Sequence, residues 1–294
     1  MRLSTMVFSV ALVASAASHA QQSYFGSVSQ AGASPPGCVL QQYSSFSAPG
    51  GVTQTCSDST GVGGGSAAAA SGHVAGSANS TVIAPGGYWS SIVNAGWSDS
   101  SVLITNTANP GFIGAVNGSL NFVFAGNLGG LGADLSLSVV EFDVIVNGMD
   151  FAAQVEHSTQ GDSCIDVNLS FCALYGGTSM NAALATQTIS LPVGTPFSLE
   201  FDLLIITEGL GLDASASADF TRSLDLAFGG ALFNFANPGY TVNAGNYIVN
   251  NRYVPAGGGN TVPEPATWLL LAAGLCAMGM ARREGMRKRA ATRA

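Results

Sequence analysis

The chain has 294 residues, of which 47% are apolar and only 9% are charged, and it contains 38 glycines. Residues 21–261 hold fifteen acidic residues against two basic ones, Arg222 and Arg252, so this span has a net charge of −13. Such an acidic surface repels phosphate backbones, which excludes nucleic acid as a partner of the main body. The composition is typical of a secreted β-rich protein and not of a cytosolic enzyme.

Residues 1–20 are predicted to form a signal peptide. Arg2 supplies the positive start, Met6–Val13 form the short apolar core, and Ser18-His19-Ala20 is a small-x-small cleavage site. The apolar run is too short to span a bilayer, and a buried first helix would need caps and an amphipathic period that are missing. We expect cleavage after Ala20, with Ala16 as a second site.

Residues 21–66 are predicted to be irregular, because Gly, Ser and Pro punctuate them throughout. The exported region contains four cysteines, which predict two disulfides in an oxidising compartment. The local pairs Cys38–Cys56 and Cys164–Cys172 are favoured by sequence separation, although the sequence leaves the other two pairings open. Cys276 remains, within the apolar run near the C-terminus.

Residues 67–256 show a period of two, which predicts strands. The clearest run places the apolar side chains of residues 140–146 on one face and Glu141 and Asp143 on the other; Asn147-Gly148 and a second alternating run follow. An Asn-Gly pair between two such runs indicates a β-hairpin. Only Ser179–Ala185 could form a short helix. We therefore predict an all-β domain, an antiparallel β-sandwich with a jelly-roll-like topology.

Nucleophilic or metal-dependent catalysis finds little support in this domain. A Ser-His-Asp site would have to use His73 or His157, and Gly161-Asp162-Ser163 is followed by Cys164-Ile165 where a trypsin-like nucleophile segment needs glycines. No Gly-x-Ser-x-Gly elbow is present. We expect His157 to lie at the surface, at the end of a strand, and expect no catalytic residue and no metal site.

Three weaker hypotheses concern sugars and calcium. Glu141 and Asp143 are close enough along one strand for glycoside hydrolysis, but nothing in the sequence marks a raised pKa, and a solvated strand face shows the same pattern. Asp162 and Asp166 could bind calcium without the EF-hand spacing. Trp89, Trp97 and Tyr88 could form a platform for sugars, although such aromatic residues are more often part of the core. No cofactor is expected.

Residues 257–294 have a different organisation. The order is a Pro-Glu-Pro triplet, the apolar run Ala266–Ala281 of about 24 Å as a helix, and a basic tail. Two prolines keep the triplet extended, and the bases would hold the C-terminus in the cytoplasm while the signal peptide sends the main body outward. The residues expected to set this topology are Trp268, Arg282, Arg283, Arg287, Lys288 and Arg289.

The triplet, run and basic tail resemble the PEP-CTERM sorting signal of Gram-negative bacteria, with Val262, Pro263, Glu264 and Pro265 as the motif. The resemblance covers residues 261–290, and the apolar run is shorter than a full span. It implies a transmembrane sorting helix, a membrane-anchored intermediate in the inner membrane, and recognition and cleavage by an exosortase. A permanent C-terminal anchor is the alternative.

Residues 95–100, 239–243 and 248–251 also resemble passenger domains of PEP-CTERM proteins, which mostly lack an assigned activity. We therefore expect a non-enzymatic protein of the cell surface or of an exopolysaccharide biofilm matrix, with extracellular polysaccharide as a candidate partner. The alternative is a secreted protein that binds or hydrolyses polysaccharide.

Overall fold

A computed structural model describes residues 22–32, 41–45, 48–132, 135–173, 177–227 and 230–254. The predicted signal peptide and the predicted sorting segment lie outside the described residues. Every regular element of the described part is a β-strand, and all strand pairs in it are antiparallel. This confirms the all-β prediction. In the described residues, no helix is long and apolar enough to cross a membrane.

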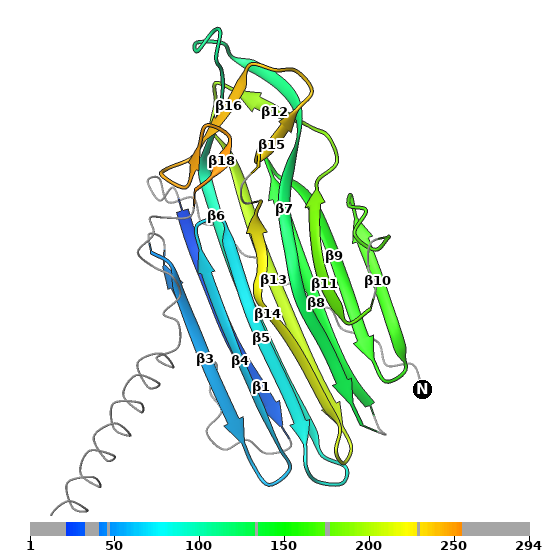
Figure 1. The fold of residues 1–294 in the computed structure, drawn as a ribbon. Coiled ribbons are helices and arrows are strands. Elements are labelled where there is room, and N and C mark those ends of the chain that lie inside the picture. The colour runs from blue at the N-terminus through cyan, green and yellow to red at the C-terminus, as the bar shows by residue number, and fades with distance from the viewer. Residues whose placement is uncertain are drawn as a thin grey trace, which may run out of the picture. The chain divides into compact units, whose positions relative to one another are not determined.

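The strands form two eight-stranded sheets, which lie one behind the other in Figure 1. The first sheet has the order β10 (Gly161–Val167), β9 (Met149–Ser158), β8 (Leu135–Val146), β13 (Phe197–Leu210), β6 (Tyr88–Asn106), β1 (Gln22–Gly32) and β2 (Gln41–Ser45), with β16 (Tyr240–Asn243) also on β6.

The second sheet has the order β11 (Ser179–Ala185), β7 (Gly114–Leu131), β14 (Ser215–Leu226), β5 (His73–Val82), β4 (Gly61–Ala70) and β3 (Gly50–Ser57), with β12 (Ile189–Val193) and β15 (Phe233–Phe235) also on β7. A small hairpin of β17 (Ile248–Val249) and β18 (Arg252–Tyr253) follows.

The strand orders give a jelly roll. Consecutive strands β5, β6, β7 and β8 alternate between the sheets, and the later pair β13–β14 inserts one strand into each sheet. The central orders are therefore β9-β8-β13-β6 and β11-β7-β14-β5, which is the arrangement of two Greek keys wrapped into a sandwich. Strands β1 to β4 and β10 widen this framework at its edges.

The predicted hairpin is present as β8 and β9. Val146 pairs with Met149, and Asn147 and Gly148 have φ values of 52° and 76°. Positive φ at both central residues is the type I′ geometry that Asn-Gly favours. Along β8 the even-numbered residues are buried and the odd-numbered ones are partly exposed, as the alternation predicts.

Two local predictions are wrong. The segment 21–66, expected to be irregular, contains β1, β2, β3 and most of β4. Its small side chains pack against a neighbouring sheet where larger ones would not fit. The segment Ser179–Ala185, considered as a short helix, is the edge strand β11, because pairing with β7 outweighs the weak helical preference of its alanines.

The sandwich interior differs along its length. One half is aromatic: Phe124 lies 4.2 Å from Phe142 and 5.2 Å from Phe220 between ring centroids. Towards the lower end of Figure 1, where β5 ends, the buried side chains include the hydroxyl groups of Ser80, Ser91 and Thr207 beside Trp89, and the Ser80 and Thr207 hydroxyls lie 2.9 Å apart. We call these two regions the aromatic half and the hydroxyl half.

Candidate functional site

An opposed pair of carboxylates lies on the outer face of the first sheet. Asp143 of β8 is the direct cross-strand partner of Asp202 of β13. The residues on either side of the pair are small, because Gly96 of β6 is opposite Asp202 and Ala152 of β9 is opposite Asp143. A Cβ atom at position 96 would overlap Asp202 Oδ1, so this carboxylate lies flat along the sheet over the glycine.

The environment of the pair favours protonation. Desolvation, followed by the negative charges of Asp150, Glu141 and Asp202, raises the pKa of Asp143 to about 7. Desolvation, followed by the charges of Glu200 and Asp150, likewise raises the pKa of Asp202 to about 7. Desolvation also raises the pKa values of Glu141, Asp150 and Glu200. The sequence did not mark these raised pKa values, because they depend on how the strands bring the carboxylates together.

Chemically, the pair can hold and donate a proton near neutral pH. A neutral carboxyl group beside an ionised one is the arrangement that glycoside hydrolysis uses. The sequence pointed to Glu141 with Asp143 on one strand, but the structure places Asp143 opposite Asp202 instead. The sequence placed Asp202 on the polar face of an alternating strand. It did not show that Asp143 lies opposite Asp202, because this depends on the register between β8 and β13.

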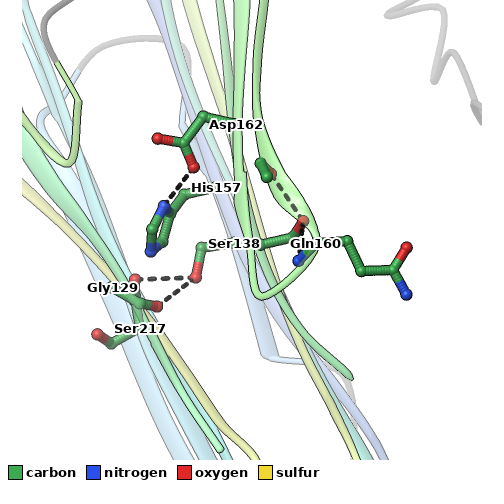
Figure 2. Close-up of polar contacts among 8 residues, drawn as sticks. Gly129, Ser138, His157, Gln160, Asp162 and Ser217 are labelled. Atoms are coloured by element: carbon green, nitrogen blue, oxygen red, sulfur yellow. Dashed lines mark hydrogen bonds and ion pairs between the residues drawn. The ribbon is translucent and has the colours of Figure 1, made fainter. Parts of the chain in front are cut away.

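His157 forms part of a polar row that crosses three strands. Figure 2 shows its ring facing Asp162, and His157 Nδ1 lies 2.6 Å from Asp162 Oδ1. Ser138 is the cross-strand partner of His157, but its hydroxyl donates to the carbonyl oxygens of Gly129 (2.7 Å) and Ser217 (3.0 Å). Ser138 is fully buried and its hydroxyl is hydrogen-bonded to the second sheet, so this residue of the row fastens the two sheets together.

The described aromatic residues do not form an exposed platform around Trp89 and Trp97. Trp89 is fully buried and donates from Nε1 to Thr60 Oγ1 (3.3 Å), and Trp97 is buried against Phe201 and Tyr247. Both are core residues, as the more common outcome for such residues predicts. Tyr88 is exposed and donates to Glu208.

The predicted disulfide Cys164–Cys172 is present, with a Cα–Cα distance of 5.6 Å. Asp166 Oδ2 accepts a hydrogen bond from the Cys172 backbone N–H (2.8 Å), so this carboxylate organises the loop that the disulfide closes. Cys56 is also disulfide-bonded, and its predicted partner Cys38 lies outside the described residues. Among the described residues, no group of three or more His, Cys, Asp or Glu side chains is arranged to hold a metal ion.

The folded unit ends in a fixed position at Val254. The Val254 N–H donates to Tyr247 O (2.7 Å), and the Tyr253 hydroxyl donates to Ser71 O (2.9 Å). Tyr247 in turn donates to Asp99 Oδ2 (2.7 Å), a buried carboxylate that also accepts from Gln22 of β1. The compact unit that contains the described residues ends at Val254.

The family comparison concerns the sequence that follows Val254. The model of the PEP-CTERM protein-sorting motif matches residues 261–288. The chain therefore carries a PEP-CTERM protein-sorting motif in these residues. Neither the curated proteins nor the solved structures contain a significant match to it.

The matched residues include every predicted residue of the sorting motif and most of the basic tail, from Val262 to Lys288. This motif is a sorting signal, which implies secretion, recognition by an exosortase and targeting to the surface. Glu264, Trp268 and the tail arginines lie outside the described residues, and the roles assigned to them stay predictions.

Proposed function

We propose that this protein is a non-enzymatic component of the cell surface or of an exopolysaccharide matrix, whose jelly roll is the exported cargo. The observation that carries the proposal is the match of the sorting motif to residues 261–288, directly after a folded unit that ends at Val254. The cargo is complete before the sorting segment begins, so cleavage at the motif would leave the jelly roll intact.

Within this proposal, exosortase cuts the chain at the Pro-Glu-Pro triplet while the apolar run holds it transiently in the inner membrane. Glu264 is the only charged residue between Arg252 and Arg282, and flanking prolines hold its backbone extended. A protease can therefore read one carboxylate on a stiff segment. The basic tail keeps the C-terminus in the cytoplasm until the cut is made.

The test is the C-terminal mass of the exported protein after cell fractionation. We expect wild type to lose the basic tail, and Glu264→Ala to keep it and stay in the membrane fraction. Glu284→Ala, which removes the same side chain from the basic tail, is the matched control and should be processed normally. An intact Arg293-Ala294 end on wild-type protein in the membrane would mean that the segment is a permanent anchor.

A polysaccharide hydrolase is the second candidate, and the specific observation in its favour is the Asp143–Asp202 pair. Both pKa values of about 7 are suited to a general acid at neutral pH. Purified exported protein would be assayed for cleavage of the organism's own exopolysaccharide. Turnover that Asp143→Asn or Asp202→Asn abolishes, and that Glu156→Gln on the same face leaves unchanged, would replace the matrix proposal with this one.

A further inference from the structure

The two outer faces of the sandwich differ in the side chains they present to solvent. On the second sheet, one cross-strand row consists of Thr53, Ser66, Ser77, Asp219, Asn127 and Ser179. These side chains are small and polar, and Ser66 and Ser77 share a hydrogen bond of 2.8 Å. Small polar residues that satisfy one another are typical of a face that stays in water.

The corresponding face of the first sheet carries large apolar side chains. Ile92 of β6, Ile206 of β13 and Val139 of β8 are consecutive partners in one cross-strand row. Leu204 precedes Ile206 on its face of β13, and Leu137 precedes Val139 on β8. Ile92 is 40% exposed, and the other four keep partial contact with solvent. We call these five residues the apolar patch.

Acidic side chains surround the patch. Glu208 and Glu156 flank it on β13 and β9, Glu141 flanks it on β8, and the Asp143–Asp202 pair lies in the outer-face row next to that of Leu204. A contiguous apolar patch rimmed by polar groups marks an interaction site. Residues 21–261 have only two basic residues, Arg222 and Arg252, against fifteen acidic ones. A second copy of this chain therefore offers few positive charges to the acidic rim of the patch.

The size of this face matches a dimer interface. Strands β1, β6, β13, β8 and β9, spaced about 4.8 Å apart over about 30 Å of length, present roughly 700 Å². A standard interface buries about 800 Å² per partner. A two-fold axis through the patch would place the apolar rows of two copies against each other, because a two-fold interface uses the same surface on both subunits.

Charge then decides when two copies can meet. The groups that face the pair are Glu141 on β8, Glu200 on β13 and Asp150 on β9, all of them acidic, and Glu208 and Glu156 lie farther along the same face. Strand β6 presents only Asn94, Gly96 and Ser98 to the pair. In neutral solution the carboxylates of this face repel a second copy, whereas protonation of Asp143 and Asp202 weakens the repulsion and adds hydrogen-bond donors.

We propose that this face is the interface between two copies of the chain, which pair sheet against sheet in mildly acidic solution and separate as the pH rises. The second sheet keeps its small polar face towards solvent in the pair. The inference is independent of the sorting proposal, because it concerns the jelly roll alone.

The test measures the mass of the protein that lacks residues 255–294, since the remaining residues form a compact unit with its own core. Multi-angle light scattering after size exclusion would be run at about pH 5.5 and about pH 8, on either side of the pKa of the pair. We expect about a two-fold larger mass at the lower pH. Monomer at both values would overturn the proposal.

Two variants identify the surface and the switch. Ile92→Lys should abolish the dimer, and Ile113→Lys, which changes a 74% exposed isoleucine in a loop, should not. Asp143→Asn with Asp202→Asn should keep the dimer at about pH 8, above the pKa of the native pair. A dimer that tolerates Ile92→Lys, or a double variant that dissociates like wild type, would refute the assignment, provided that circular dichroism shows the variants folded.

Discussion

The aromatic half and the hydroxyl half of the interior join the same two sheets by different means. In the aromatic half, rings such as Phe124, Phe142 and Phe171 fill the space between the sheets. In the hydroxyl half, Gly65 has no side chain, and a Cβ there would lie 2.5 Å from Val93 and 3.2 Å from Val28, both on the first sheet. A sandwich can therefore be closed either by filling its interior with large rings or by placing a glycine opposite the side chains of the other sheet.

The difference teaches how a Gly- and Ser-rich sequence can form ordered strands. Where the sheets approach closely, glycine is required by space, and a buried serine is tolerated because it finds a partner on the opposite sheet. Ser80 Oγ, for example, lies 3.0 Å from Thr207 O on the first sheet. Low side-chain volume in such strands reflects close packing and does not indicate disorder.

The largest effect is expected from emptying the aromatic half. Phe124→Ala removes a fully buried ring that contacts Phe142, Phe171 and Phe220. The free energy of unfolding should fall by about 3–5 kcal/mol, the usual cost of such a cavity. Urea denaturation followed by tryptophan fluorescence measures it. A loss below about 1 kcal/mol would mean that this half is loosely packed.

Adding volume to the hydroxyl half should have the next largest effect. Gly65→Ala places a methyl group against Val93 and Ser77 O, and the free energy of unfolding should fall by about 1–3 kcal/mol. Gly111→Ala is the control, because its methyl group would have open space around it, and it should be neutral within about 0.5 kcal/mol. Equal effects of the two changes would contradict the close approach of the sheets.

Removing one hydroxyl from the same half should cost somewhat less. Ser80→Ala leaves Thr207 Oγ1 without its buried partner at 2.9 Å, and the loss should be about 1–2 kcal/mol. The double variant Ser80→Ala with Thr207→Val should recover part of this loss, because both polar partners are then absent. Additive losses in denaturant unfolding would show that the two hydroxyls act independently.

The smallest expected effect is the change of the free energy of unfolding with pH, which depends on Asp143 and Asp202 on the outer face of the first sheet. The pKa of about 7 for Asp143 and Asp202 exceeds the unfolded value, so the folded state binds more protons than the unfolded state between about pH 4 and pH 7. The free energy of unfolding should therefore decrease as the pH rises through this window. Solvent contact of both groups keeps the change modest.

Asp143→Asn with Asp202→Asn should flatten this dependence and make the protein more stable than wild type at about pH 8. Denaturation at several pH values, at a protein concentration low enough to keep the chain monomeric, measures the slope. A slope that is unchanged in the double variant would assign the pH dependence to other carboxylates.

The sequence predicted the parts of the fold that depend on local pattern. Alternation identified β8, β9 and β13, and Asn147-Gly148 identified their first hairpin with its turn type. Strands β1 to β4 were missed because their small residues resemble those of a linker. Only their pairing with other strands, such as β1 with β6 and β4 with β5, shows that they belong to the sheets. Local pattern reports on burial only when the buried side chains are large.

The candidate sites divide in the same way. The sorting motif was predictable because its residues are contiguous and its order is specific. The Asp143–Asp202 pair was not, because the two residues lie far apart along the chain and only the register of β8 with β13 brings them together. The polar row of His157, Asp162 and Ser138 likewise depends on two strand registers.

The polar network that holds both ends of the jelly roll has a kinetic consequence. Gln22 at the start of the folded unit and Tyr247 near its end both bind the carboxylate of Asp99, and β1 pairs with β6 across most of their length. Contacts between such distant residues give a high contact order, which slows folding. A chain still emerging from the membrane lacks Tyr247, so the network closes only when translocation is nearly finished. The exported chain is therefore expected to cross unfolded and to complete its last contacts just before the sorting segment arrives.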